Sequence, residues 1–385
     1  MMFSSGGQRN QEAGMLRKAQ AMMRTTRTEQ RSMSDGLAGA RLSRRELLRG
    51  LGGMALGAVA LGAAGCAVPG FAAAPTKVPA SGMSLLVYKG HSKAVNGLIW
   101  SPDGAQIASA SSDNTATTWN ATTGETLLTY KGHKKEVWDI GWSPDGARIV
   151  TGSADNTAQV WDAQTGKQIQ TFDGQTNDVN SVSWSPDSTK VASGSADHTT
   201  AIWDAATASL LLSYTRYLSF VFAVRWSPDG SRIASGSADY TARVFSAVTG
   251  GDAIVYRNHS LAVNSVAWSP DSTQVVSASQ DGTAQVWDTV AARTLVTFSD
   301  HKAPVICVAW SPNGKLIASG GADQQVRVWN AATGAPVFSY QGHVSQQKIN
   351  DQPAGQVHAL AWSPDGRRIA SAALDGTVHV WNAPA

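Results

Sequence analysis

From residue 84 onward, apolar residues alternate with polar or small residues in short runs, and no stretch repeats with the period of a helix. The first of these stretches predicts four strands, at 95–100, 106–111, 115–120 and 126–130. The turn Ser101-Pro102-Asp103-Gly104 separates the first two strands, with Ser, Pro and Gly where a type I turn favours them. Short strands with turn residues between them predict an all-β closed or stacked architecture.

Three series of aromatic residues divide this part of the chain into seven similar units. The tripeptide Trp-Ser-Pro begins, at intervals of 42 residues and finally 52, at Trp100, Trp142, Trp184, Trp226, Trp268, Trp310 and Trp362. A second series stands 19 residues further on, at Trp119, Trp161, Trp203, Phe245, Trp287, Trp329 and Trp381. The third series comprises Tyr88, Tyr130, Phe172, Tyr214, Tyr256, Phe298 and Tyr340. The agreement of the three series predicts seven units of four strands.

Two polar positions also recur. The hairpin between the second and third strands holds an aspartate in every unit: Asp113, Asp155, Asp197, Asp239, Asp281, Asp323 and Asp375. A histidine precedes the first strand in five units, as His91, His133, His259, His301 and His343, whereas units three and four have Gln175 and Tyr217. With the Trp-Asp or Trp-Asn that ends the third strand, these residues resemble the WD-repeat family. The resemblance covers residues 84–385 and implies a seven-bladed β-propeller of four-stranded antiparallel blades.

The ends of the repeat array predict how the ring closes. The last unit stops at Trp381-Asn382 and has no fourth strand of its own. Residues Ser84–Tyr88 precede the first unit and have the pattern of a fourth strand, with Tyr88 in register with the third aromatic series. We expect this N-terminal strand to complete the last blade, which hides two otherwise open edges.

The repeated His, Ser and Asp residues look like catalytic triads, but a hydrolase needs one nucleophile and one oxyanion site rather than a set repeated around a ring. The resemblance implies instead that they form a buried structural network with the third-strand residues Trp119, Trp161, Trp203, Trp287, Trp329 and Trp381. We therefore expect no enzyme activity and no cofactor. Because units three and four lack the histidine, we expect incomplete networks and the least stable blades there.

The family's contact positions on the upper face flank the valine that opens each first strand. Carried onto this chain, they predict a protein-binding set of Glu136, Trp138, Asp178, Asn180, Phe220, Phe222, Ile306 and His358. Trp138 is the one tryptophan outside the two tryptophan series, so we expect its removal to weaken partner binding and to leave stability nearly intact. Phe220 and Phe222 have two interpretations: partner contact, or filling of space left by the histidine and tryptophan that unit four lacks.

Several single features have plainer interpretations. Unit seven carries ten additional residues at 344–353, which we expect to be a solvated excursion. Cys307 lies among apolar residues of a first strand and is predicted to be a small buried side chain rather than a nucleophile. His198, His358 and His379 have no spacing typical of metal ligands.

Residues 1–66 are predicted to be a disordered leader that ends in an export signal. Ser43-Arg44-Arg45-Glu46-Leu47-Leu48 precedes the uncharged run 51–65, and the two together resemble a twin-arginine signal. The segment 61–66 resembles a lipoprotein box, which implies lipid attachment at Cys66, with Ala63 where the box prefers Leu. The alternative is cleavage near 71–74. An Ala/Pro-rich linker is expected at 67–83, and Met33 is a second candidate start.

The formal net charge of +3 averages two unlike regions. Residues 1–50 hold ten Lys and Arg against four Asp and Glu, which leaves 21 basic and 24 acidic residues for the remainder. A slightly acidic propeller has no basic stripe for phosphates, so nucleic acid is not expected as a partner. Two cysteines exclude a disulfide scaffold.

These observations favour a non-enzymatic protein-binding scaffold outside the bacterial cytoplasm, with any membrane attachment through a lipid at Cys66. One alternative is a small-ligand-binding or catalytic-accessory propeller that uses its central channel. The other is a cytoplasmic signalling adaptor, if the paired arginines are not an export signal.

Overall fold

The structure, a computed structural model, describes residues 83–384. The predicted leader and export signal at 1–66, the lipid site at Cys66 and residues 67–82 of the linker lie outside the described residues. Between residues 83 and 384, no helix is long and apolar enough to cross a membrane.

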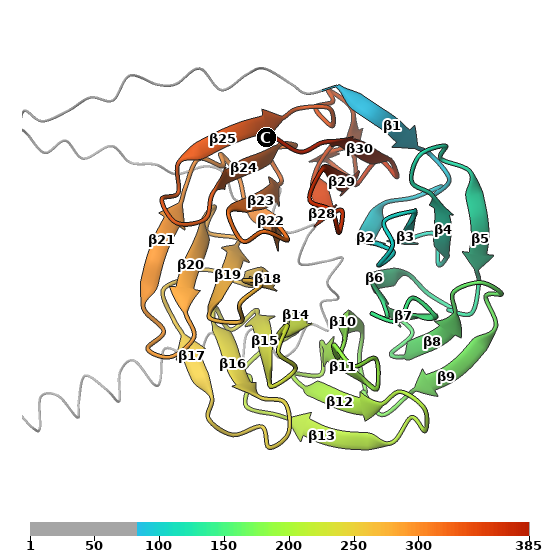
Figure 1. Cartoon of the computed structure of the whole chain (residues 1–385), viewed down its shortest axis with the longest axis vertical. Coiled ribbons are helices and arrows are strands. Elements are labelled where there is room, and N and C mark those ends of the chain that lie inside the picture. Colours follow the sequence, from blue (N-terminus) through green and yellow to red (C-terminus); the bar gives the residue numbers. More distant parts are fainter. Residues whose placement is uncertain (1–82, 385) are drawn as a thin grey trace, which may run out of the picture. The chain divides into compact units, whose positions relative to one another are not determined.

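Seven four-stranded antiparallel sheets stand like blades around a central axis, which confirms the predicted all-β, seven-bladed propeller (Figure 1). Blade 1 comprises β2 (Val95–Trp100), β3 (Gln106–Ser111), β4 (Ala116–Asn120) and β5 (Thr126–Tyr130). Blade 2 comprises β6 (Val137–Trp142), β7 (Arg148–Ser153), β8 (Ala158–Asp162) and β9 (Gln168–Phe172). Blade 3 comprises β10 (Val179–Trp184), β11 (Lys190–Ser195), β12 (Thr200–Asp204) and β13 (Leu210–Tyr214).

The remaining blades repeat this order from an inner first strand to an outer fourth strand. Blade 4 comprises β14 (Val221–Trp226), β15 (Arg232–Ser237), β16 (Ala242–Ser246) and β17 (Ile254–Tyr256). Blade 5 comprises β18 (Val263–Trp268), β19 (Gln274–Ser279), β20 (Ala284–Asp288) and β21 (Thr294–Phe298). Blade 6 comprises β22 (Val305–Trp310), β23 (Leu316–Gly321), β24 (Val326–Asn330) and β25 (Pro336–Tyr340). Blade 7 comprises β28 (Val357–Trp362), β29 (Arg368–Ala373), β30 (Val378–Asn382) and β1 (Ser84–Tyr88).

The ring closes as the sequence predicts, because β1 is the outer strand of the last blade. It pairs antiparallel with β30, placing Ser84 opposite Trp381 and Tyr88 opposite Val378. The N-terminal strand therefore covers the free edge of the C-terminal strand, and the two ends of the propeller meet in one sheet (Figure 1).

Two of the aromatic series pair with each other between neighbouring blades. Tyr88 of β1 stacks on Trp119 of blade 1 with ring centroids 4.4 Å apart, and Tyr130 of blade 1 stacks on Trp161 of blade 2 at 4.8 Å. The other stacked pairs are Phe172–Trp203, Tyr214–Phe245, Tyr256–Trp287, Phe298–Trp329 and Tyr340–Trp381. Each pair contributes about 0.5–1.5 kcal/mol beyond the apolar area it buries. The period of 42 residues thus sets one blade-to-blade contact per unit.

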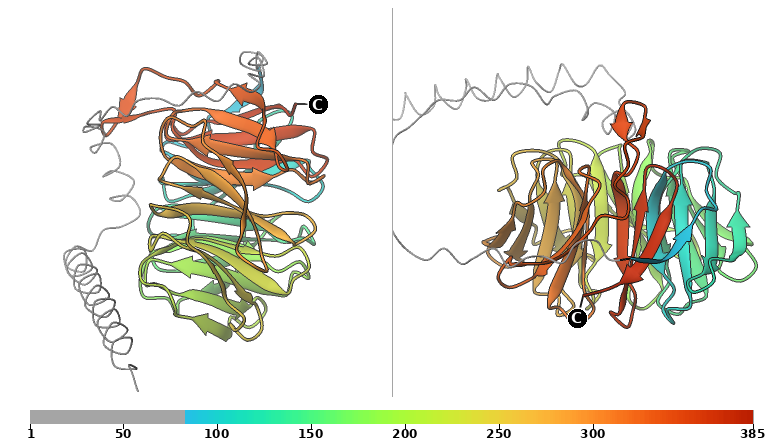
Figure 2. Two further views of the ribbon diagram at one scale, coloured as in Figure 1. Left: turned by 90° about the vertical axis from the view of Figure 1, so that its left-hand side faces the viewer. Right: turned by 90° about the horizontal axis from the view of Figure 1, so that it is seen from above.

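The additional residues of unit seven are mostly exposed, as expected of a solvated excursion, and they are ordered. They form a two-stranded hairpin of β26 (Lys348–Ile349) and β27 (Gln352–Pro353). In the right-hand view of Figure 2 this hairpin, drawn in orange-red, projects from one face of the ring. Ile349 is exposed and Gln352 is buried.

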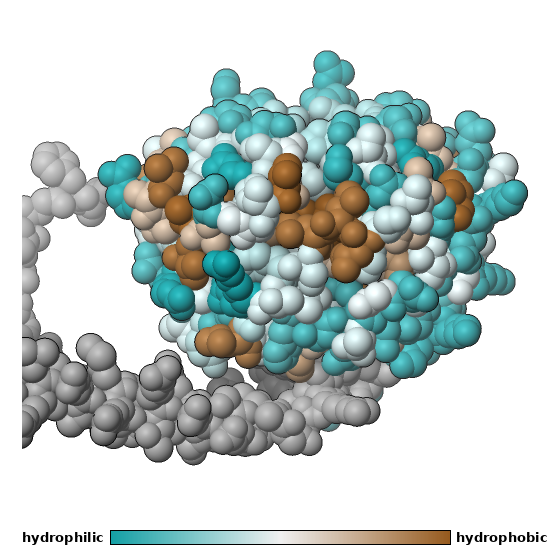
Figure 3. Space-filling view, turned by 90° about the horizontal axis from the view of Figure 1, so that it is seen from below, coloured by the Kyte–Doolittle hydropathy of each residue, from teal (hydrophilic) through white to brown (hydrophobic). Residues whose placement is uncertain are grey.

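The outer wall of the ring carries an apolar patch on β13. Figure 3 views the side of the ring that lies at the bottom of Figure 1, where β13 runs, and apolar side chains gather near its middle. Leu210 and Leu211 are 53% and 49% exposed. The outer edge of β13 has no partner strand among the described residues, so backbone groups and leucine side chains are accessible together.

Candidate protein-binding face

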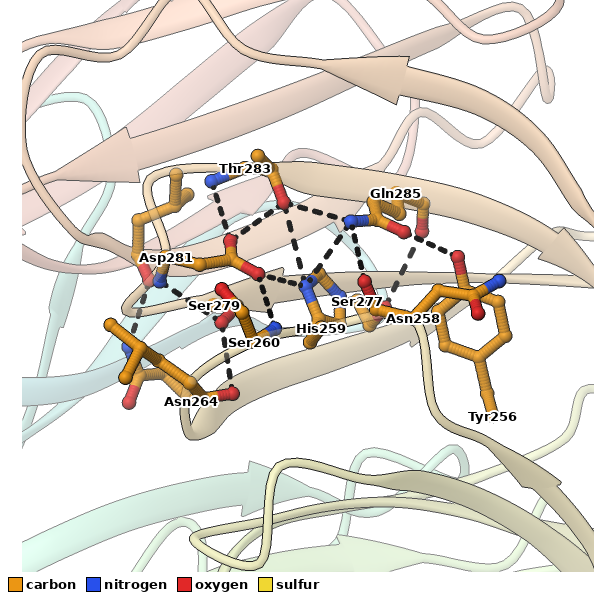
Figure 4. Close-up of polar contacts among 12 residues, drawn as sticks. Tyr256, Asn258, His259, Ser260, Asn264, Ser277, Ser279, Asp281, Thr283 and Gln285 are labelled. Atoms are coloured by element: carbon orange, nitrogen blue, oxygen red, sulfur yellow. Dashed lines mark hydrogen bonds and ion pairs between the residues drawn. The ribbon is translucent and has the colours of Figure 1, made fainter. Parts of the chain in front are cut away.

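The repeated polar residues form one connected network, shown for blade 5 in Figure 4. His259 bonds through Nδ1 to Asp281 Oδ2 at 2.9 Å and through Nε2 to Ser277 Oγ at 2.8 Å. Trp287 donates its indole N–H to the same hydroxyl at 3.2 Å. Burial alone raises the pKa of Asp281, but hydrogen bonds from His259 and Thr283 hold it at about 2. The network ties the connection before the blade to the central hairpin and the third strand.

Blades 1, 2 and 6 contain the same histidine–aspartate link. The distances are 3.0 Å for His91–Asp113, 2.9 Å for His133–Asp155 and 3.0 Å for His301–Asp323. In blade 2, Thr151 replaces the serine. The indole N–H of Trp161 has no hydrogen-bond partner within 83–384. In these links the hydroxyl partners Ser109, Thr151 and Ser319 are fully buried, which fits a structural role for the repeated groups.

In blade 3 a glutamine takes the place of the missing histidine. Gln175 accepts a hydrogen bond from Ser193 Oγ at 2.7 Å and donates one to Thr199 Oγ1 at 3.1 Å. Trp203 donates to Ser193 at 2.8 Å, and Asp197 accepts from Thr199 at 2.7 Å. The prediction of an incomplete network in unit three is therefore wrong, because an amide supplies both a donor and an acceptor.

Blade 4 restores its network with two different residues. Tyr217 donates its hydroxyl to Ser235 Oγ at 2.7 Å. Asp239 pairs with Arg243 Nη2 at 2.7 Å, and both side chains are almost fully buried. Arg243 also lies over the Tyr217 ring, 4.8 Å from its centroid. The prediction of an incomplete network in unit four is therefore also wrong, because an arginine on the third strand replaces the histidine as the partner of the aspartate.

The broken link lies in blade 7, whose histidine and aspartate are both present. His343 Nε2 bonds Ser371 Oγ at 2.8 Å, but Nδ1 has no partner within the described part of the chain, and Asp375 is exposed. His343 stacks instead on His379, with ring centroids 4.0 Å apart. The predicted His343–Asp375 pair is therefore wrong. The insertion 344–353 replaces the short connection that elsewhere holds the aspartate against the histidine.

A layer of side chains next to the opening valines surrounds the upper part of the channel. In alternate blades an asparagine donates to the valine carbonyl of the next blade, as Asn96–Val137 at 2.9 Å, Asn180–Val221 at 3.0 Å and Asn264–Val305 at 2.8 Å. The other blades place Trp138, Phe222, Ile306 and His358 at this level, and all are buried. The layer joins neighbouring blades by hydrogen bonds and packing.

Most of the predicted contact set lies below the surface of the upper face. Six of its eight members are buried, namely Trp138, Asp178, Asn180, Phe222, Ile306 and His358, while Glu136 and Phe220 are half-buried. Trp138 is 3% exposed and hydrogen-bonds to the Asp178 carboxyl. The expectation that Trp138 is dispensable for the fold is therefore wrong. Burial raises the pKa of Asp178, against the lowering effect of Lys135.

Sequence reasoning missed a charged clamp on the channel wall. Arg225 Nη1 donates to Asp139 Oδ2 at 3.0 Å and to Ser181 Oγ at 2.9 Å, so one guanidinium joins blades 2, 3 and 4. Ser181 also donates to Asp139 at 2.8 Å. The available clue was that Arg225 is the only charged residue at the fifth position of a first strand.

Exposed apolar residues of the upper face lie in two places: in unit four with the connection that follows it, and in the insertion of unit seven, where Val344 is 49% and Ile349 36% exposed. Leu218 is 83% exposed, Tyr240 47% and Leu261 41%, and Phe220 is half-buried. Two backbone hydrogen bonds hold the connection before blade 4 against its central hairpin: Leu218 N–H to Asp239 at 3.2 Å, and Ala238 N–H to the Phe220 carbonyl at 2.8 Å. We call Leu218, Phe220, Tyr240 and Leu261 the blade 4 patch.

The fold and the structural use of the repeated polar groups in blades 1 to 6 define a β-propeller scaffold. The family described as WD domain, G-beta repeat matches residues 82–120, 124–162, 166–204, 209–246, 252–288, 292–330 and 334–382, and the chain belongs to this WD40 family. WD40 propellers typically serve as non-enzymatic scaffolds for protein interactions. No curated protein matches the chain. Among residues 83–384, no three His, Cys, Asp or Glu side chains are grouped to hold a metal ion.

Proposed function

We propose that this protein is a non-enzymatic scaffold that binds another protein outside the bacterial cytoplasm. One observation carries the proposal: the His, Ser and Asp groups of the repeat hold the segments of each blade together, while blade 4 presents Leu218 and Tyr240 as exposed apolar departures from the repeat on the upper face. Catalysis would need an accessible nucleophile and base, whereas a protein partner needs an exposed apolar surface on a rigid support.

The extracytoplasmic location rests on the paired arginines and the apolar run that follows them. Replacing both Arg44 and Arg45 with Lys should keep the protein in the cytoplasmic fraction. If Cys66 carries a lipid, Cys66→Ser should abolish metabolic lipid labelling and release the protein from membranes. Cys307→Ser is the matched control, because Cys307 is buried in β22 and should not affect labelling. Unchanged labelling of Cys66→Ser contradicts the lipid anchor.

Affinity capture from envelope extract tests the scaffold function. The wild-type protein should retain a defined partner in a stoichiometric amount. Arg225→Ala alters the channel wall and leaves the upper face intact, so it should retain the same partner. Capture of no partner by the wild-type protein refutes the scaffold function. Loss of capture in Arg225→Ala would favour the central channel as the working site.

A further inference from the structure

Unit four departs from the repeat at three of the four positions that form the blade 4 patch; the fourth, Leu261, lies on the connection before blade 5. Five of the other six units place Ser, Thr or Lys where Leu218 stands, and at the Phe220 position they have Ala, Glu, Asp, Pro or Gln. The core of blade 4 is complete without Leu218 and Tyr240, which remain largely exposed. Packing therefore does not account for Leu218 and Tyr240, whereas the half-buried Phe220 contacts the rings of His198 and Phe222.

Tyr240 occupies an unfavourable backbone conformation. Its φ is 69°, at the hairpin position where the other units have Asn114, Asn156, His198, Gly282, Gln324 and Gly376. Asparagine and glycine tolerate this left-handed region, whereas a bulky side chain is disfavoured there. The exposed tyrosine ring does not compensate by burial in the free protein. His198 and Gln324 adopt the same conformation in units three and six, so what distinguishes Tyr240 is that it presents an exposed aromatic ring at this position.

The support beneath the patch is rigid. The buried Arg243 donates to Asp239 on the hairpin and to the backbone carbonyl of Arg216 on the preceding connection. One guanidinium thus holds together the two segments that carry Leu218, Phe220 and Tyr240. A surface that is ordered before binding loses less conformational entropy when a partner docks.

The two connections that carry the patch contain only basic charged residues, while Asp197, next to the His198 that contacts Phe220, accepts hydrogen bonds from Thr176 and Thr199. Arg216 and Arg257 are exposed at the start of the two connections that carry the patch, and neither connection contains an acidic residue. The aspartates of the adjoining hairpins, Asp239 and Asp281, are already paired with Arg243 and His259. Two exposed arginines beside an apolar surface are complementary to carboxylates that flank apolar side chains.

We propose that the blade 4 patch binds an extended acidic segment of a protein partner. Leucine or phenylalanine side chains of the segment lie against Leu218, Phe220 and Tyr240, and its carboxylates reach Arg216 and Arg257. The inference rests on the proposed scaffold function and names the surface and the chemistry of the partner.

Fluorescence anisotropy with the full chain tests the proposal. Two labelled synthetic peptides share alternating Leu and Phe residues, with Asp and Glu between them in one peptide and Lys in the other. The acidic peptide should bind at least about tenfold more tightly than the Lys peptide, and added salt should weaken its binding. Arg216→Ala should weaken binding of the acidic peptide by about tenfold.

Tyr240→Asn separates binding from stability, because it introduces the residue that units one and two have at this position. It should raise or preserve the melting temperature and weaken binding of the acidic peptide by about tenfold. Val290→Ser is the matched control: Val290 is 81% exposed, but it lies on the turn between β20 and β21, at the opposite ends of the strands. This variant should bind like wild type.

Four results overturn the proposal: no binding of the acidic peptide, equal binding of the Lys peptide, unchanged binding in Tyr240→Asn and Arg216→Ala, or binding only to vesicles of anionic phospholipid. Envelope capture distinguishes this failure from failure of the scaffold function. A partner retained equally by wild type and the Tyr240→Asn, Arg216→Ala double variant leaves the scaffold function standing and refutes this surface. Absence of any captured partner refutes the scaffold function itself.

Discussion

Mild acid should weaken the last blade through its stacked histidines. Burial, reinforced by the neighbouring His379, lowers the pKa of His343 to about 3, and burial also lowers the pKa of His379. Both groups are neutral when folded, whereas the unfolded chain takes up protons near pH 6.5. The stability is therefore full above pH 6.5 and is lost progressively as the pH falls toward the folded-state value.

The size of the effect follows from these values. For His343 alone, the free energy of unfolding falls by about 1.4 kcal/mol for each pH unit below 6.5, which is about 2 kcal/mol at pH 5. The groups that face the pair do not remove this loss. Asp375 raises the pKa of His379 and Lys89 lowers it. The hydrogen bond with Ser371 raises the pKa of His343 but does not offset its burial, and Tyr340 bonds to His379.

Urea unfolding between pH 8 and pH 5 measures the loss, with His343→Gln and His379→Gln as matched variants. Glutamine is suitable because Gln175 fills the histidine position in blade 3, and Gln159 stands where His379 does in blade 2. The double variant should lose about 2 kcal/mol less than wild type over this range. Asp281, with its pKa lowered to about 2, keeps its contribution until the pH falls below about 3.8, outside this window. Equal pH dependence of wild type and double variant would refute the argument.

Three further outcomes are expected. Deleting Ser84–Tyr88 exposes the edge of β30 and should cause aggregation or a large fall in melting temperature. Deleting residues 67–80 should change the melting temperature little. Equal melting temperatures of the two deletion variants would contradict the closing role of Ser84–Tyr88. Trp138→Ala should lower the free energy of unfolding by about 3–5 kcal/mol, as for a buried tryptophan. A free energy of unfolding in urea close to that of wild type would contradict this expectation. Arg225→Ala should cost about 1–3 kcal/mol by leaving Asp139 without its cation, measurable against Arg225→Lys.

The fold could be predicted because its information is periodic. Tyr130 and Trp161 belong to two series that agree over seven units, and they stack on each other between blades. The closing strand could be predicted because Tyr88 shares the register of its series. The position of a residue in the repeat is therefore enough to predict its neighbour in the adjacent blade, and the conformation of the intervening loops is not needed.

The site could be predicted less well, because its details depend on contacts that the repeat does not encode. Arg243 compensates for the missing histidine from a different strand. The effect of an insertion on His343 and Asp375 depends on the path of the loop rather than on the identities of these two residues. The repeat predicts the correct level of Trp138 in the ring, but the burial of this side chain depends on side chains from other blades.

The closing strand also orders events during synthesis. Ser84–Tyr88 leaves the ribosome before any blade, yet its partner β30 is the last strand to be made. The blade that completes the ring is thus built from the most distant segments of the propeller, a contact that is slow to form because of the long chain between them. Until release, blades can fold one after another, but β1 remains an unpaired apolar strand on the nascent chain. A chain that terminates early never conceals this strand, so incomplete products differ from the finished protein by an exposed N-terminal segment that chaperones and proteases can recognise.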